Sequence, residues 1–212
     1  MDFQRARTKE QVEERQLDIM NACDVLFDEG GYENVNIKAI SEITTLTRSS
    51  IYTYYKTKDE IILDLLGYEL TEWGEELLIW CKETAPLERL EFSRQFTNNL
   101  LKKEKLLKHY CLLFALLEKN CRLEKLVEFK LKAIPVAGIL VQIIIANFPN
   151  YSQQEASVIV EQMIALIIGL YPVSHITPKQ QEAIELSHTG YVTPDFVSVC
   201  QRGIAALLGQ EI

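Results

Sequence analysis

Apolar residues recur along most of the chain at spacings of three and four, which is the period of an amphipathic α-helix. No run of alternating β-branched residues between hairpin turns competes with that pattern. The fold class expected is therefore all-α. The predicted helices lie at about residues 8–29, 37–44, 48–55, 58–82, 86–101, 104–118, 121–147, 153–172, 178–187 and 194–209.

Signals for helix starts and stops support these boundaries. Thr57 and Ser152 each precede a glutamate by three residues, the spacing of a capping box. Thr177 and Thr193 each stand directly before a proline, which predicts a hydroxyl at the N-cap and proline at the first helical position. Further predicted signals are caps at Asn36 and Thr47 and a stop at Gly30-Gly31.

The two short helices at 37–44 and 48–55, joined by a turn of three to four residues, predict a helix-turn-helix. Ile51 and Tyr55 are four apart and face one core, which leaves Arg48, Ser49 and Tyr52 on the outward faces. Small residues let the start of such a helix enter the major groove, where arginine pairs with guanine. The segment at about 36–55 therefore predicts a DNA reader.

The net charge of −8 argues against nucleic acid, but the charges are unevenly distributed. Residues 10–46 carry nine acids against Arg15 and Lys38, whereas residues 47–58 carry three cations and no acid. A second basic group, Arg5, Arg7 and Lys9, lies near the start of the chain. Locally placed cations such as Lys56 and Lys58 are what phosphate contacts need.

Residues 19–66 resemble the DNA-binding domain of the tetracycline-repressor (TetR) family. The matching elements are Ala22, Leu26-Phe27, Gly31-Tyr32, Ile40, Leu46-Thr47, Ile51-Tyr52, Tyr55, Lys58 and Glu60-Ile61. The resemblance implies phosphate contacts for Thr47, Tyr52 and Lys58, and a cap that also touches the DNA backbone for Asn36. It implies base-facing positions for Arg48, Ser49, Ser50 and Tyr54.

One position departs from the family pattern, because Thr45 stands where the turn usually has glycine. If this turn needs a positive φ, a β-branched residue there costs about 1–2 kcal/mol. Either the turn has another geometry, or DNA binding is weakened. The departure motivates an alternative hypothesis, in which a dimer of the same fold is a co-regulator or adaptor that binds a protein partner.

The DNA-binding domain is expected over residues 1–66 and a helical effector-binding and dimerisation domain over 67–212. The helix at 153–172 is apolar nearly all round, and in the helix at 194–209 the small Gly203 permits close approach. The resemblance implies a homodimer through these two helices. Such a dimer would bind a pseudo-palindromic operator with half-sites one helical turn apart, ~34–36 Å.

The resemblance also implies an effector pocket enclosed by the helices at 86–147, and repression as the default response. The apolar residues there favour a hydrophobic or aromatic effector, whose binding would shift the helix at 58–82. The candidate lining residues are Trp80, Phe96, His109, Tyr110, Phe114 and Phe129.

Other classes of function find little support. The sequence has no GxSxG, P-loop or HExxH motif, so we expect no enzyme and no cofactor. The three histidines favour core or surface roles over a metal site. Five widely spaced cysteines indicate reduced thiols and a cytoplasmic protein, with Cys81 the best candidate for a redox sensor. The polar first residues and the short apolar stretch at 133–148 predict no signal peptide and no membrane span.

Overall fold

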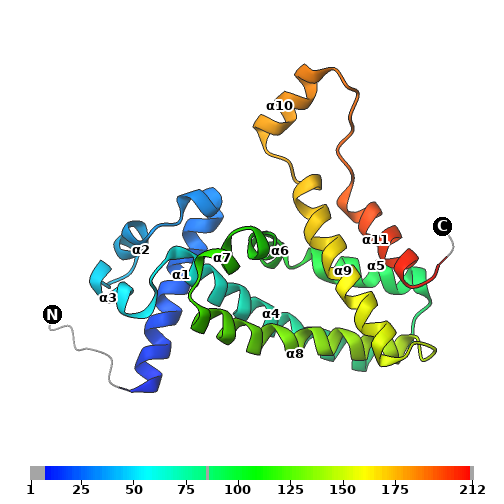
Figure 1. Cartoon of the computed structure of the whole chain (residues 1–212), viewed down its shortest axis with the longest axis horizontal. Helices are drawn as coiled ribbons and strands as arrows, with labels where there is room; N and C mark the ends of the chain where they lie inside the picture. Colours follow the sequence, from blue (N-terminus) through cyan, green and yellow to red (C-terminus); the bar gives the residue numbers. More distant parts are fainter. Residues whose placement is uncertain (1–7, 85, 211–212) are drawn as a thin grey trace. The chain divides into compact units, whose positions relative to one another are not determined.

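The computed structural model describes residues 8–84 and 86–210, and within these ranges it contains helices and no strand (Figure 1). This confirms the all-α prediction. The helices are α1 (Lys9–Asn34), α2 (Ile37–Ile43), α3 (Arg48–Tyr54), α4 (Lys58–Glu83), α5 (Arg89–Leu101), α6 (Glu104–Leu112), the π-helical turn η1 (Leu113–Leu117), α7 (Glu118–Asn120), α8 (Leu123–Asn147), α9 (Gln153–Ser174), α10 (Pro178–Ser187) and α11 (Phe196–Leu207).

The helices form two compact units that are discontinuous in sequence. Among the described residues, the first unit contains those from Thr8 to Tyr68 together with Leu113–Leu131, and the second contains those within Glu69–Leu112 and from Lys132 to Gln210. Helices α4 and α8 each pass from one unit into the other. The division expected at residue 66 differs from this arrangement, because it assigns residues 113–131 to the C-terminal domain.

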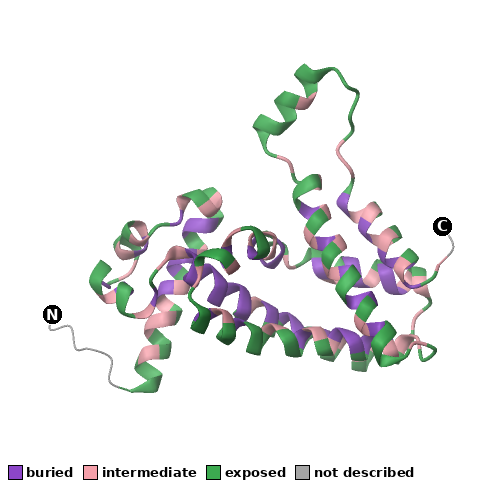
Figure 2. Cartoon of the chain, viewed as in Figure 1, coloured by how far each residue is buried: buried purple, intermediate pink, exposed green. Residues whose placement is uncertain are grey.

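The first unit has an aliphatic core to which α1, α2, α3 and the start of α4 contribute (Figure 2). Ile19, Ile40 and Ile51 are fully buried in it. The predicted stop at Gly30-Gly31 is present as a break in helical geometry, with Gly31 at φ 68° and ψ −163°. Glycine adopts this conformation without the steric penalty of a Cβ atom, so the chain can turn from α1 toward α2.

The second unit packs α11 against both α5 and α9. Gly203 of α11 permits this approach, because a Cβ atom there would lie 2.5 Å from Cδ2 of Leu166 on α9. Aromatic rings fill the space beside these helices, and Phe92 has its ring centroid 5.8 Å from Trp80, 5.9 Å from Phe96 and 5.4 Å from Phe148. Such ring pairs add to the stability gained from burial.

Most of the predicted caps in the second unit are present. Ser152 and Thr177 each accept a hydrogen bond from the backbone N–H three residues later, at 3.3 Å. The prediction of Thr193 as an N-cap was wrong. Helix α11 begins at Phe196, and the Asp195 carboxylate caps it by accepting the Ser198 N–H at 2.7 Å. A carboxylate at the helix start also complements the helix dipole.

Helices α8 and α9 are long and apolar enough to cross a membrane when judged by length and composition alone, with mean hydropathy of 1.9 and 1.8. The core helices of soluble proteins pass the same test. Only 33% of the apolar window of α8 and 39% of that of α9 is buried within the chain. Both helices therefore keep apolar side chains exposed, including Val127 and Leu131 on α8 and Val158 and Val173 on α9.

Candidate nucleic-acid interface

The two short helices of the first unit form the predicted helix-turn-helix. The side chain of Asn36 caps α2 by accepting the Ala39 N–H at 2.9 Å. The side chain of Thr47 caps α3 by accepting the Ser50 N–H at 3.2 Å. Each cap satisfies a backbone donor that the first turn of a helix leaves without a partner, so both predicted caps are confirmed.

Helix α3 has one buried and one exposed face. Ile51 and Tyr55 have no exposed surface, because they pack into the core of the first unit. Arg48, Ser49 and Tyr52 lie on the exposed side, and Tyr52 keeps 46% of its surface accessible. The predicted separation of the two faces is therefore confirmed, and it presents a cation, a hydroxyl and a phenol together.

Hydroxyl groups gather at the start of α3. The Oγ1 atom of Thr47 lies 2.9 Å from the Oγ atoms of both Ser49 and Ser50. Ser50 and Tyr54 are half-buried, so they are less accessible than Arg48 and Ser49. Hydroxyls can donate or accept, which makes them suited to phosphate oxygens and to base edges.

The turn between α2 and α3 does not need a glycine. In the described part of the chain, His188 is the one non-glycine residue with a positive φ, so Thr45 does not adopt the left-handed conformation. The turn is held by the Oγ1 atom of Thr44, which donates to the Ile40 carbonyl at 3.0 Å and accepts the Leu46 N–H at 3.3 Å. The turn therefore lacks the positive φ that would make a β-branched residue unfavourable at position 45.

The two lysines that follow α3 differ in environment. Lys56 is exposed, and its Nζ atom donates to the Tyr52 carbonyl at 2.6 Å. Lys58 is half-buried, donates to the Tyr32 carbonyl at 2.8 Å and lies 3.7 Å from the centre of the Tyr32 ring. Both lysines therefore have a backbone partner within the protein, and Lys56 is the more accessible of the two cations that the sequence predicted for phosphate contacts.

Tyr32 in turn ties the end of α1 to the start of α4. Its hydroxyl donates to the Asp59 carboxylate at 2.7 Å. Burial, together with the hydrogen bond and the negative charge of Asp59, raises the pKa of Tyr32 to about 12. The phenol therefore stays protonated and keeps its donor role at neutral pH.

Sequence reasoning missed a set of ion pairs beneath the helix-turn-helix. The buried Glu60 carboxylate accepts hydrogen bonds from the guanidinium of Arg122, and Lys125 donates to Asp64 at 2.8 Å. Burial by itself raises the pKa of Glu60, but hydrogen bonds from the Arg122 side chain and from two backbone N–H groups outweigh it and lower the pKa. No local sequence pattern predicts these ion pairs, because the partners are far apart in the chain. Arg122 and Glu60 are separated by 62 residues, and Lys125 and Asp64 by 61.

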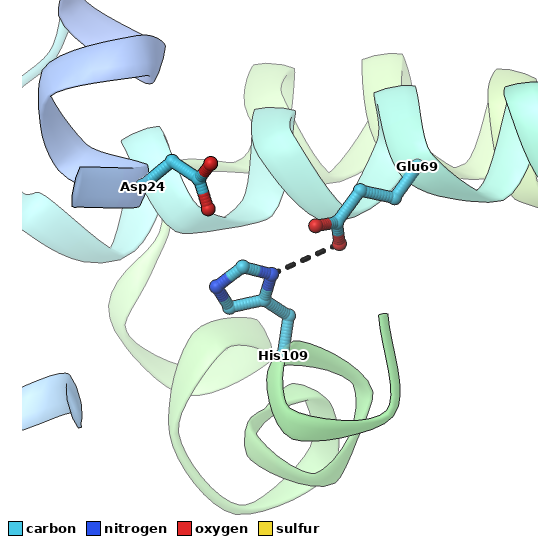
Figure 3. A group of neighbouring side chains, drawn as sticks. All are labelled: Asp24, Glu69 and His109. Atoms are coloured by element: carbon cyan, nitrogen blue, oxygen red, sulfur yellow. Dashed lines mark hydrogen bonds and ion pairs between the residues drawn. The ribbon is translucent and has the colours of Figure 1, made fainter. Parts of the chain in front are cut away.

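The six candidate effector residues fall into both units. Phe114 and Phe129 belong to the first unit, where Phe114 is 60% exposed and Phe129 is buried. The other four belong to the second unit: Trp80, Phe96, His109 and Tyr110. In that unit Trp80 and Phe96 both contact Phe92 in the aromatic cluster. The buried His109 places Nδ1 2.9 Å from the Glu69 carboxylate (Figure 3).

A family profile described as "Bacterial regulatory proteins, tetR family" matches residues 19–65, and a second, described as "Tetracyclin repressor-like, C-terminal domain", matches residues 68–209. No curated protein matches the chain in sequence.

Solved structures show the same fold at low sequence identity. The regulator FadR from Bacillus subtilis, solved with stearoyl-CoA, is 16% identical with a TM-score of 0.56, over 90% of this chain and 96% of that one. A TetR-family regulator from Streptomyces coelicolor is 15% identical with a TM-score of 0.53, over 92% and 98%. FadR from Bacillus halodurans is 13% identical with a TM-score of 0.53, over 96% and 97%.

The two profiles together match most of both units and include the helix-turn-helix with its exposed face on α3. Members of this family are transcription factors and not enzymes, so the expectation of a non-enzymatic protein is confirmed. The chain therefore belongs to the tetR family of bacterial regulatory proteins and is a DNA-binding transcriptional regulator.

Proposed function

We propose that the protein is a ligand-responsive repressor that binds a pseudo-palindromic operator as a homodimer. The observation that carries the proposal is the exposed face of α3, where Arg48, Ser49 and Tyr52 are accessible while Ile51 and Tyr55 are locked in the core. A helix anchored on one side and polar on the other can enter the major groove without unfolding its own domain.

In this proposal Arg48 pairs with a guanine, and Ser49, Ser50 and Tyr54 face neighbouring bases. Asn36, Thr47, Tyr52 and Lys58 contact phosphates and fix the register of α3 on the duplex. Lys58 is half-buried and bonded to the Tyr32 carbonyl, whereas Lys56 is exposed, so its ammonium group can reach a phosphate while keeping its hydrogen bond to the Tyr52 carbonyl. The DNA-binding role is assigned to the residues up to 66, and effector binding and dimerisation to 67–212.

The dimer is proposed to form through α9 and α11. The two predicted apolar stripes of α9 are largely buried within the chain, one at Ile159 and Met163 and the other at Val160 and Ile167, so they are not free for a partner. A third stripe stays exposed and includes Val158, Ala165, Gly169 and Val173. Small residues in its middle permit close approach of a second helix, and its apolar ends favour burial.

An apolar effector is proposed to bind in the second unit. The aromatic cluster around Phe92 and the apolar character of α8 and α9 support a hydrophobic ligand. The solved FadR from Bacillus subtilis contains stearoyl-CoA, which makes long-chain acyl-CoA the first compound to test. Binding would act on α4, which begins in the first unit and ends in the second. We expect a cytoplasmic location, because both proposed partners, an operator and a metabolite, are found in that compartment.

Selection from a random pool of double-stranded DNA at a stated moderate salt concentration tests the proposal. We expect a palindrome with half-sites about one helical turn apart, and release of that DNA on addition of acyl-CoA. A folded, dimeric protein that recovers no motif would instead favour the adaptor hypothesis. The geometry of the turn at Thr45 removes the main reason for preferring that alternative.

A further inference from the structure

The carboxylate of Glu60 joins the end of the recognition helix α3 to residues that come much later in the chain. Glu60 has no exposed surface and lies in the first turn of α4. Its Oε2 atom accepts the backbone N–H of Lys56, the residue just past the C-cap of α3, at 2.7 Å. The same atom accepts from the guanidinium of Arg122 at 2.8 Å, and the Oε1 atom accepts from Nε of Arg122.

A second pair lies one turn further along α4. The Asp64 carboxylate accepts from Nζ of Lys125 at 2.8 Å, and Lys125 also donates to Glu128 at 2.7 Å. The side chain of Lys125 is 8% exposed, and its Nζ atom lies 5.1 Å from the centre of the Tyr55 ring. Tyr55 is the C-cap residue of α3, so this pair reaches the same end of the recognition helix.

Both carboxylates need their partners. A buried carboxylate is tolerated only when hydrogen bonds and an opposite charge compensate for the water it has lost. Without Arg122, the Glu60 carboxylate would keep the Lys56 N–H but would lose its bidentate cation. Water or a proton would then have to enter beside the backbone that holds the end of α3.

We infer that Arg122 and Lys125 are positioning residues for DNA recognition, which hold the C-terminal end of α3 through Glu60 and Asp64. Arg122 directly precedes α8 and Lys125 lies in its first turn, and α8 continues to Asn147 in the second unit. A displacement of α8 is therefore passed to α3 by side chains as well as by the backbone of α4. The inference rests on the proposed function, because it names a route by which an effector would change operator binding.

Amide hydrogen exchange in the free full-length protein tests the positioning role without DNA. Arg122→Ala should speed exchange at the amides of Tyr55 and Lys56 by about tenfold, because the Glu60 carboxylate that accepts the Lys56 N–H loses the guanidinium hydrogen bonds that position it. Arg122→Lys should give a smaller increase, since a lysine keeps the charge but loses the paired donors. The matched control is Lys130→Ala, which removes an ion pair between α8 and Glu118 of α7 that does not involve α3 or α4. Exchange in Arg122→Ala equal to that in the control would overturn the inference.

Operator affinity gives the second readout, and Lys125→Met serves if Arg122→Ala does not fold. Affinity should fall by about tenfold while the slope of log affinity against log salt stays unchanged, because no phosphate contact is removed. A slope reduced by about one would mean that Arg122 binds a phosphate, and would overturn the positioning role. A wild-type protein that selects no operator would count against the proposed function alone, because the exchange measurement does not depend on DNA.

Discussion

Arg122 and Glu60 are separated by 62 residues and form a paired contact, with Nη2 of the guanidinium 2.8 Å from Oε2 of the carboxylate. The glutamate lies in the first turn of α4, the helix that follows the recognition helix, and the arginine directly precedes α8. The helix-turn-helix is therefore supported by a segment that belongs, by sequence position, to the C-terminal half of the chain. Because of this ion pair, the stability of the first unit depends on pH and on residues outside the helix-turn-helix.

The first prediction concerns the stability of the fold at acidic pH. The pKa of Glu60 in the folded protein lies below the ordinary value of 4.5, so its pair stabilises the fold fully above that value and less as pH falls through the lowered pKa. Glu60→Gln should be less stable than the wild type at neutral pH, by about 1 kcal/mol. The difference should shrink as the pH falls below 4.5 and through the lowered pKa of Glu60. Thermal unfolding of both proteins across this range measures it, and a difference independent of pH would contradict the ionic role of Glu60.

The second prediction concerns the base contact of Arg48. Arg48→Ala should weaken operator binding by about 1–3 kcal/mol and relax the preference for guanine at one position of each half-site. Because Arg48 is exposed, the melting temperature should stay unchanged. Arg94→Ala in the second unit is the control, since Arg94 is an exposed arginine far from α3 in sequence and paired with Glu91. Equal affinities for the two variants would remove Arg48 from the reading face.

The third prediction concerns the turn. If the turn required a positive φ, Thr45→Gly would stabilise the protein by about 1–2 kcal/mol. Since Thr45 has a negative φ, we expect the opposite sign, a loss of up to about 1 kcal/mol from the added freedom of the unfolded chain. Chemical denaturation of the two proteins decides the sign. Unchanged or improved stability in the glycine variant would show that the turn is strained.

The fourth prediction concerns the dimer face of α9. A Cβ atom at Gly169 would meet nothing within 4 Å in the monomer, so Gly169→Leu should fold normally. It should nevertheless shift the protein toward monomers in analytical ultracentrifugation, because the leucine would fill the space that a partner helix needs. Gly138→Leu on α8 is the matched control, since a Cβ atom there also meets nothing within 4 Å. A Gly169→Leu protein that stays dimeric would place the interface elsewhere.

Local signals in the sequence predicted most of the helices and the reading face of the motif. The cap at Thr47 and the four-residue spacing of Ile51 and Tyr55 fixed α3 and its orientation, because capping and helical period act within a few residues. The start of α11 was misplaced because Thr193-Pro194 carries a cap signal, while the Asp195 carboxylate, one residue further on, makes the better cap. Competition between neighbouring caps is decided by the packing of the helix, which begins at the buried Phe196.

The sequence by itself determined the helical class, the order of the helices, the helix-turn-helix and the resemblance that leads to a regulator of transcription. Only the tertiary structure decided that residues 113–131 join the first unit, that Arg122 and Lys125 pair with buried acids at the start of α4, and which stripe of α9 stays exposed. The physical reason is the separation along the chain over which each kind of interaction acts. Caps and periodicity depend on neighbours within one or two turns, whereas ion pairs and shared faces depend on where distant segments meet.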